Sequence, residues 1–263
     1  MYEHHKIAIQ NLVDYYRSQE GVIAIILGGS VAKGTERIDS DIDATIVVTE
    51  ERYQELKARN GLADVVSGHC SYEGGYFDIK YESKSFLLEM AEKGSEPCRS
   101  SYISAKCLYS TDPEIQELVE RIPVFQSKEK ENKLFSFYSA FDLSFGYIWS
   151  TAAADNPYYK IRTAADIIYY GYRILLQENE VLFPSHRRLE ETVARLNKKP
   201  DGIIEKAHRF LSELSDESKD DFVNSIRTFM SYTPPEDFWE TLTRYIDDNQ
   251  HWWHTNAPVL TEW

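Results

Sequence analysis

Residues 28–43 read GGSVAKGTERIDSDID, and this stretch decides the fold. The apolar run Val22–Leu27 precedes it, and a second apolar run, Ile42–Val48, begins inside its end. Each run has the length and composition of a short buried strand. Asp41 and Asp43 stand at positions i and i+2 where the second strand opens, so both project from one face. A strand, a glycine turn and paired acids in this order predict a metal site beside a turn.

The chemistry of these groups agrees with that geometry. Magnesium takes oxygen ligands in an octahedron and is usually held by one or two carboxylates together with substrate phosphates. Asp41 and Asp43 are therefore candidate ligands. A glycine turn with bare amides, followed by a hydroxyl and a helix start, suits a triphosphate tail. Gly28, Gly29 and Ser30 supply those groups.

This joined motif resembles the signature of the nucleotidyltransferase superfamily, the polymerase-beta-like group: Gly-Ser, a spacer of about ten residues, then Asp-x-Asp. Its small-residue helix start, Val31–Gly34, is similar to that of bacterial antibiotic and aminoglycoside nucleotidyltransferases. The resemblance implies an α/β (α+β) domain with a mixed sheet, one or two Mg²⁺ ions, and ATP or another NTP as substrate. It also makes Ser40 and Lys33 candidate nucleotide contacts, although Lys33 equally fits a solvated helix surface.

The superfamily pattern includes a third acid on a later strand. Gly74-Gly75 is typical of a hairpin turn, and the aromatic-rich run Tyr76–Tyr81 after it has strand character. Within that run, Asp78 matches the third carboxylate, either as a further metal ligand or as a proton acceptor. The alternatives are Asp64, at a strand start, and Glu73, in the turn.

The chain has 263 residues, of which 42% are hydrophobic, which is enough for two domains with separate cores. We expect the catalytic domain over residues 1–125, where Ala105–Tyr109 fits either a last strand or a buried helical turn. Residues 126–263 have apolar side chains at helical spacing and predict an all-α bundle that binds the acceptor and forms the other wall of a cleft. Helices are expected from Leu134, near Tyr159 to Glu178, and after Pro184, Asp201, Ser218 and Pro235.

A second, less specific resemblance lies in the bundle. Val181–Leu189 is similar to the helical-domain segment of uncharacterised two-domain bacterial nucleotidyltransferases, in which an aromatic-proline turn leads a basic helix. Arg187 and Arg188 could then reach phosphates, and a solvated first helical turn is the alternative.

Charge and hydropathy restrict the partners. Residues 1–125 hold 21 Asp and Glu against 13 Lys and Arg, and residues 126–263 hold 22 against 16. A protein that follows a nucleic-acid backbone needs a basic patch, so we expect no long nucleic-acid partner. No apolar run approaches the roughly 18 residues of a membrane span, and no signal-peptide core stands in the first 20 residues. These features predict a cytoplasmic protein and leave its oligomeric state open.

An acidic surface suits a cationic acceptor such as an aminoglycoside. The helical half holds acids and rings that could recognise an amine through charge and cation–π contacts, although tyrosines at helical spacing also fit a packed bundle. They are Asp155, Tyr158, Tyr159, Asp166, Tyr169, Tyr170, Trp239, Trp252 and Trp253.

Together these features predict an enzyme that transfers a nucleoside monophosphate from a magnesium-bound NTP, with ATP favoured, to a hydroxyl of a small acceptor. Pyrophosphate is the second product. Two other classes stay open at this point. One is a nucleotidyltransferase that modifies a protein or RNA end, as in antitoxin-like adenylylation, and the other is a non-catalytic nucleotide-binding module.

Overall fold

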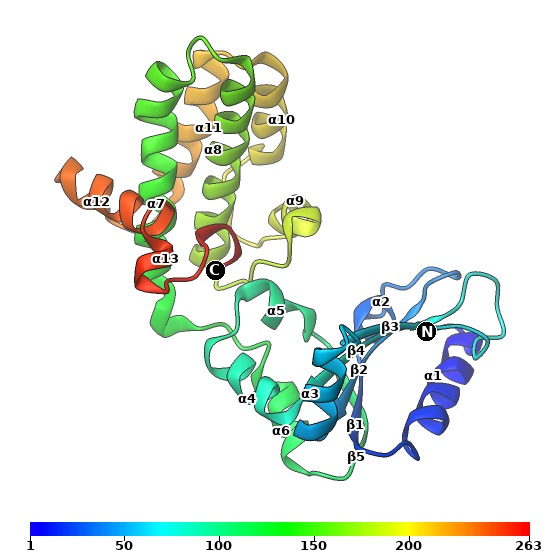
Figure 1. Cartoon of the computed structure of the whole chain (residues 1–263). Coiled ribbons are helices and arrows are strands. Elements are labelled where there is room, and N and C mark those ends of the chain that lie inside the picture. The colour runs from blue at the N-terminus through cyan, green and yellow to red at the C-terminus, as the bar shows by residue number, and fades with distance from the viewer. The chain divides into compact units, whose positions relative to one another are not determined.

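The computed structural model describes all residues, Met1–Trp263, and they divide into two compact units, Met1–Val124 and Phe125–Trp263. The first unit is a mixed five-stranded sheet with helices, and the second is built from helices alone (Figure 1). The predicted fold class is therefore confirmed.

The first unit alternates strands and helices. Its elements are α1 (Glu3–Tyr16), β1 (Val22–Leu27), α2 (Gly29–Lys33), β2 (Ile42–Val48), α3 (Glu50–Ala58), β3 (Ala63–Val66), β4 (Phe77–Ser83), α4 (Lys84–Lys93), α5 (Glu96–Ser101), β5 (Lys106–Ser110) and α6 (Glu114–Arg121). Side-chain caps set two of the helix starts, because Thr49 accepts a hydrogen bond from the Arg52 amide and Ser83 accepts one from the Phe86 amide.

The strands lie in the order β3-β4-β2-β1-β5. The central pair, β2 and β4, is parallel, and the other three pairs are antiparallel. In the parallel pair, Ile42 lies opposite Phe77 and Asp43 lies opposite Asp78. The two strands therefore begin at the same edge of the sheet, and the acids of both strands meet there.

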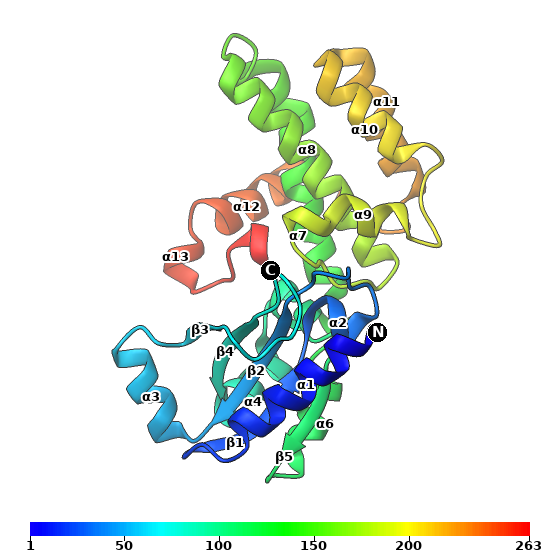
Figure 2. The same cartoon turned by 90° about the vertical axis from the view of Figure 1, so that its right-hand side faces the viewer.

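Helices cover both faces of the sheet, which explains why β1 is apolar on both sides (Figures 1 and 2). On one face, Leu12 and Tyr16 of α1 pack on side chains such as Ile46 and Ile79. On the other face, helices α4 and α6 pack on Ala24, Ile26 and Val47. Because side chains alternate along a strand, Asp43 shares the second face with Val47.

The structure corrects one connection expected from the sequence and decides between the alternatives for another segment. Gly74-Gly75 is not a tight hairpin turn: residues 67–76 form a longer connection between β3 and β4, although the two strands do pair antiparallel. The segment Ala105–Tyr109, for which strand and helical turn were both open, falls largely within β5, which pairs with β1. The short helix α5 lies between α4 and β5 and was not predicted.

The second unit consists of helices of very different length. They are the 3-10 turn Ser127–Glu129, α7 (Lys130–Leu143), the π-helical turns Ser144–Ala152, α8 (Pro157–Glu178), the 3-10 turn His186–Arg188, α9 (Leu189–Ala194), α10 (Ile203–Glu213), α11 (Asp216–Phe229), α12 (Phe238–Asn249), α13 (Trp252–Thr255) and the 3-10 turn Leu260–Glu262. Helix α11 starts before Ser218 rather than after it, because Ser215 caps the helix by accepting from the Ser218 amide.

Helix α8 is the centre of this unit and packs against α7, α10 and α11. Its Gly171 allows close packing, since a Cβ there would lie 3.0 Å from the Phe222 ring. Arg173 on the same helix is fully buried between the rings of Phe137 and Phe183, 4.2 and 4.3 Å from their centroids, and donates to the Tyr169 hydroxyl. No helix in either unit has the length and apolar character needed to cross a membrane.

Candidate active site

Three carboxylates meet at the edge of the sheet where β2 and β4 begin. Asp41 lies one residue before β2, Asp43 is its second residue, and Asp78 is the second residue of β4. One oxygen from each of these half-buried side chains lies within 4.8 Å of one from each of the others. We call these three residues the acid triad.

The glycine turn is packed directly against the triad. The Gly28 amide donates to the Asp43 carbonyl at 2.9 Å, which joins the end of β1 to β2. Gly29 has φ +63°, and a Cβ on it would lie 1.7 Å from Asp43 Oδ2. Glycine is therefore required at this position for two reasons: the backbone is left-handed, and the Asp43 carboxylate occupies the space that a side chain would need.

Electrostatics in the triad favour a bound cation. Burial and the nearby charges of Asp41 and Asp78 raise the pKa of Asp43, while Lys80 and a hydrogen bond from the Ser30 amide act in the opposite direction. Clustered carboxylates repel one another unless a cation or a proton offsets their charge. An all-oxygen set of this kind fits Mg²⁺, which takes carboxylates and phosphate oxygens.

The register of the strands explains which of the three candidate acids joins Asp41 and Asp43. Val65 of β3 lies opposite Asp78, and Asp64 lies opposite Ile79, so Asp64 projects from the other face of the sheet. Asp64 is exposed, and its carboxylate accepts from the Val65 amide. Glu73 lies in the connection before β4. Of the three candidates, the fold brings Asp78 to the paired acids.

The remaining nucleotide-binding candidates occupy different positions. Ser30 lies in the turn beside Asp43, whereas Lys33 is an exposed residue at the last position of α2. Ser40 is 7% exposed, and its hydroxyl accepts from the Arg37 amide while its carbonyl accepts from the Tyr72 hydroxyl. Its side chain thus closes the loop that leads to Asp41.

Two residues beside the triad were missed by the sequence analysis. The Tyr76 hydroxyl lies near the Asp41 carboxylate, and this neighbour raises the pKa of Tyr76. Lys80 follows Asp78 at i+2 on β4 and therefore lies on the same face. Strand alternation could have identified Lys80, whereas the contact of Tyr76 depends on the loop.

Comparison with known proteins agrees with this geometry. Residues 10–114 match the family model "Polymerase beta, Nucleotidyltransferase", and the matched region contains the whole triad. These residues form a nucleotidyltransferase domain. No curated protein matches the chain.

Two solved structures resemble the chain at low sequence identity. A nucleotidyltransferase-like protein from Exiguobacterium sibiricum 255-15 has a TM-score of 0.50 at 8% identity, over 91% of this chain and 76% of its own. Spectinomycin adenyltransferase AAD(9) from Enterococcus faecialis, solved with ATP and spectinomycin, has a TM-score of 0.32 at 12% identity, over 93% and 96%. The first likeness supports the fold, and the family model matches the part of the chain that holds the acid triad.

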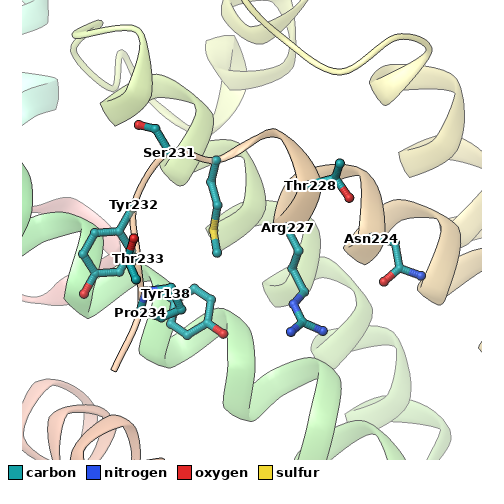
Figure 3. Close-up of a pocket in the computed structure, with 9 residues that line it drawn as sticks. Tyr138, Asn224, Arg227, Thr228, Ser231, Tyr232, Thr233 and Pro234 are labelled. Atoms are coloured by element: carbon teal, nitrogen blue, oxygen red, sulfur yellow. The ribbon is translucent and has the colours of Figure 1, made fainter. Parts of the chain in front are cut away.

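The helical unit has its own hollow, which contains no triad residue. It measures about 490 Å³ and is lined by residues of α7, α11 and the segment after α11: Tyr138, Asn224, Arg227, Thr228, Met230, Ser231, Tyr232, Thr233 and Pro234. Figure 3 shows the Arg227 and Tyr138 side chains from two different helices at this hollow. Its lining is mainly polar and includes one cation, so it differs from the acidic and aromatic acceptor surface expected from the sequence.

The expected acceptor residues divide into two groups. Tyr169 and Tyr170 are only 7% and 5% exposed and belong to the core, which agrees with the alternative that these tyrosines pack the bundle. Asp166 forms an ion pair with Arg162 of the same helix. The remaining residues are solvent-accessible: Asp155, Tyr158, Trp239, Trp252 and Trp253 are exposed, and Tyr159 is half-buried.

The two basic residues of the second resemblance lie in the 3-10 turn before α9. Arg188 is paired with Glu191 at 2.7 Å, and Arg187 is exposed. The pairing of Arg188 agrees with the solvated alternative for that residue.

Proposed function

We propose that the protein transfers a nucleoside monophosphate from a magnesium-bound NTP to a hydroxyl group of a small acceptor. The observation that carries this proposal is the acid triad, which lies beside a glycine turn in a nucleotidyltransferase domain. ATP is the donor favoured by the resemblance to antibiotic nucleotidyltransferases.

The bonds of the reaction follow from this assignment. The acceptor hydroxyl oxygen attacks the α-phosphorus, the bond from that phosphorus to the β-bridging oxygen breaks, and pyrophosphate leaves with the bonding electron pair. Asp41 and Asp43 would hold magnesium, which offsets negative charge on the phosphate oxygens when bound. Asp78 would either complete the ligand set or accept the proton of the acceptor hydroxyl.

The acceptor in this proposal is a cationic small molecule, with aminoglycosides as the first class to test. Two features support it: the chain carries a net charge of −14, and the helical unit exposes tyrosine and tryptophan rings. A ring under a cation contributes roughly 0.5–2 kcal/mol, and acids attract amines over distances set by the salt concentration.

The test is a transfer assay with purified protein, magnesium, each labelled NTP in turn and a panel of cationic antibiotics. The proposal expects a labelled acceptor with one NTP preferred. Asp41→Asn should abolish the signal, and Asp39→Asn is the matched control, because Asp39 lies two residues away, is exposed and is paired with Arg37. Equal transfer by Asp41→Asn and wild type would contradict the assignment.

A further inference from the structure

The sheet face that carries the triad continues into a second polar group. In the parallel pair, Thr45 lies opposite Lys80, two residues along from Asp43 and Asp78. Glu82 follows Lys80 at i+2 and therefore projects from the same face. Polar side chains thus extend along this face from the triad towards the helices that cover it.

A buried tyrosine ties this group together. Tyr102, at the end of α5, is 5% exposed and donates its hydroxyl to Glu82 at 2.6 Å. Thr45, whose strand also carries Asp43, lies near the same hydroxyl. Burial raises the pKa of Glu82, and the hydrogen bond from Tyr102 and the nearby positive charge of Lys80 oppose that rise. Glu82 is therefore a carboxylate fixed at one place by a neighbour from another element.

Lys80 stands between two sources of negative charge. It attracts both Asp43 and Glu82, and in each case it lowers the pKa of the carboxylate. Its side chain is exposed and forms no hydrogen bond or ion pair in the structure. A lysine ammonium has three donors and no acceptor, so Lys80 presents a cation with all its donors available on the triad face.

We propose that Lys80 is a phosphate-contacting residue of this site, which binds the triphosphate tail of the nucleotide and then the pyrophosphate product, and that Glu82 and Tyr102 are its positioning residues. This inference rests on the proposed function and deepens it. No proton moves in this contact: the ammonium donates hydrogen bonds to phosphate oxygens, and its charge offsets the charge that the leaving pyrophosphate gains. Lysine is suited to this role as a compact cation.

Equilibrium binding of magnesium pyrophosphate tests the proposal without knowledge of the base or the acceptor. A charge-assisted hydrogen bond contributes enough to affinity that its loss weakens binding by about 10- to 100-fold. We expect that loss in Lys80→Gln and a smaller one in Lys80→Arg, which keeps the charge. Lys57→Gln is the matched control, because Lys57 is an exposed lysine of the same unit on α3.

Tyr102→Phe tests the positioning role through a double-mutant cycle. If Tyr102 acts through Lys80, Tyr102→Phe weakens pyrophosphate binding severalfold in wild type and has no further effect in Lys80→Gln. A purely structural role would change the melting temperature and leave the two effects on binding additive, which would overturn the assignment of Tyr102.

Two failures are distinguishable in this experiment. Wild-type protein that binds no pyrophosphate with magnesium overturns the proposed function and this inference together. Wild-type protein that binds, with Lys80→Gln binding equally at an unchanged melting temperature, overturns the role of Lys80 alone.

Discussion

At the scale of single residues, the acid triad costs stability when its acids are ionised and no cation is bound. The folded-state pKa of Asp43 lies above its ordinary value because the carboxylate is partly buried beside two other acids. For an acid with a raised folded-state pKa, the folded state is favoured by protonation and loses stability as pH rises through the window between the unfolded and folded values. Groups that cost stability in this way are often retained for function.

Asp41→Asn and Asp43→Asn should each lower transfer by at least about 10²-fold, the scale of losing one strong electrostatic stabiliser. Because ionised Asp43 costs stability at neutral pH, the melting temperature of Asp43→Asn should be unchanged or higher. Transfer at saturating magnesium, measured together with thermal unfolding, checks both statements. Wild-type rates in either variant would exclude the assignment of Asp41 and Asp43 as metal ligands.

Asp78→Asn separates two roles of the third acid. If Asp78 accepts the proton, the rate should fall about 10²–10⁴-fold while nucleotide binding is retained. If it is a metal ligand, the magnesium affinity should fall as well. Asp64→Asn, on the opposite sheet face, is the matched control and should behave as wild type. The assignment of Asp78 is wrong if its variant keeps full activity.

At the scale of elements, the turn between β1 and α2 and the parallel pair β2 and β4 build the site. A substitution in the turn tests the packing against Asp43. Gly29 and Gly34 both have positive φ, but a Cβ on Gly34 meets nothing within 4 Å. Gly34→Ala should therefore lower the free energy of unfolding by only about 1–2 kcal/mol, the cost of a left-handed backbone for alanine.

Gly29→Ala should lose more stability than Gly34→Ala and most of its transfer activity, because Asp43 must move out of the triad. Urea unfolding and the transfer assay, run on both variants, measure the difference. Equal stability and activity of the two alanine variants would show that the close approach of Gly29 to Asp43 has no consequence.

The sequence predicts those parts of the site that are encoded locally. The apolar runs predict β1 and β2, and the alternation of side chains along a strand places Asp41 and Asp43 on one face. Asp78 required a family resemblance, because its register opposite Asp43 depends on how two separate strands pair. The Tyr102 contact with Glu82 could not be predicted, since it links an unpredicted helix to a strand 20 residues earlier.

At the scale of the whole molecule, charge should govern acceptor binding. The net charge of −14 is distributed over both halves of the chain. Binding of an aminoglycoside to the protein with magnesium ATP should weaken as salt is raised, because salt screens the attraction between exposed charges that lie farther apart than about 10 Å at 0.1 M salt, and over shorter distances at higher salt. Calorimetry at low and high salt measures this. A neutral or anionic acceptor that binds while every polyamine-like compound gives no heat would contradict the cationic assignment.

The central claim is nucleotidyl transfer at the acid triad, and the position of the label in ATP tests it most directly. With ATP labelled at the α-phosphate, we predict magnesium-dependent label in the acceptor, absent in Asp43→Asn. With ATP labelled at the γ-phosphate, we predict label only in pyrophosphate. Transfer of the γ-label to the acceptor, or α-label transfer that survives both chelation of magnesium and Asp43→Asn, would contradict the account.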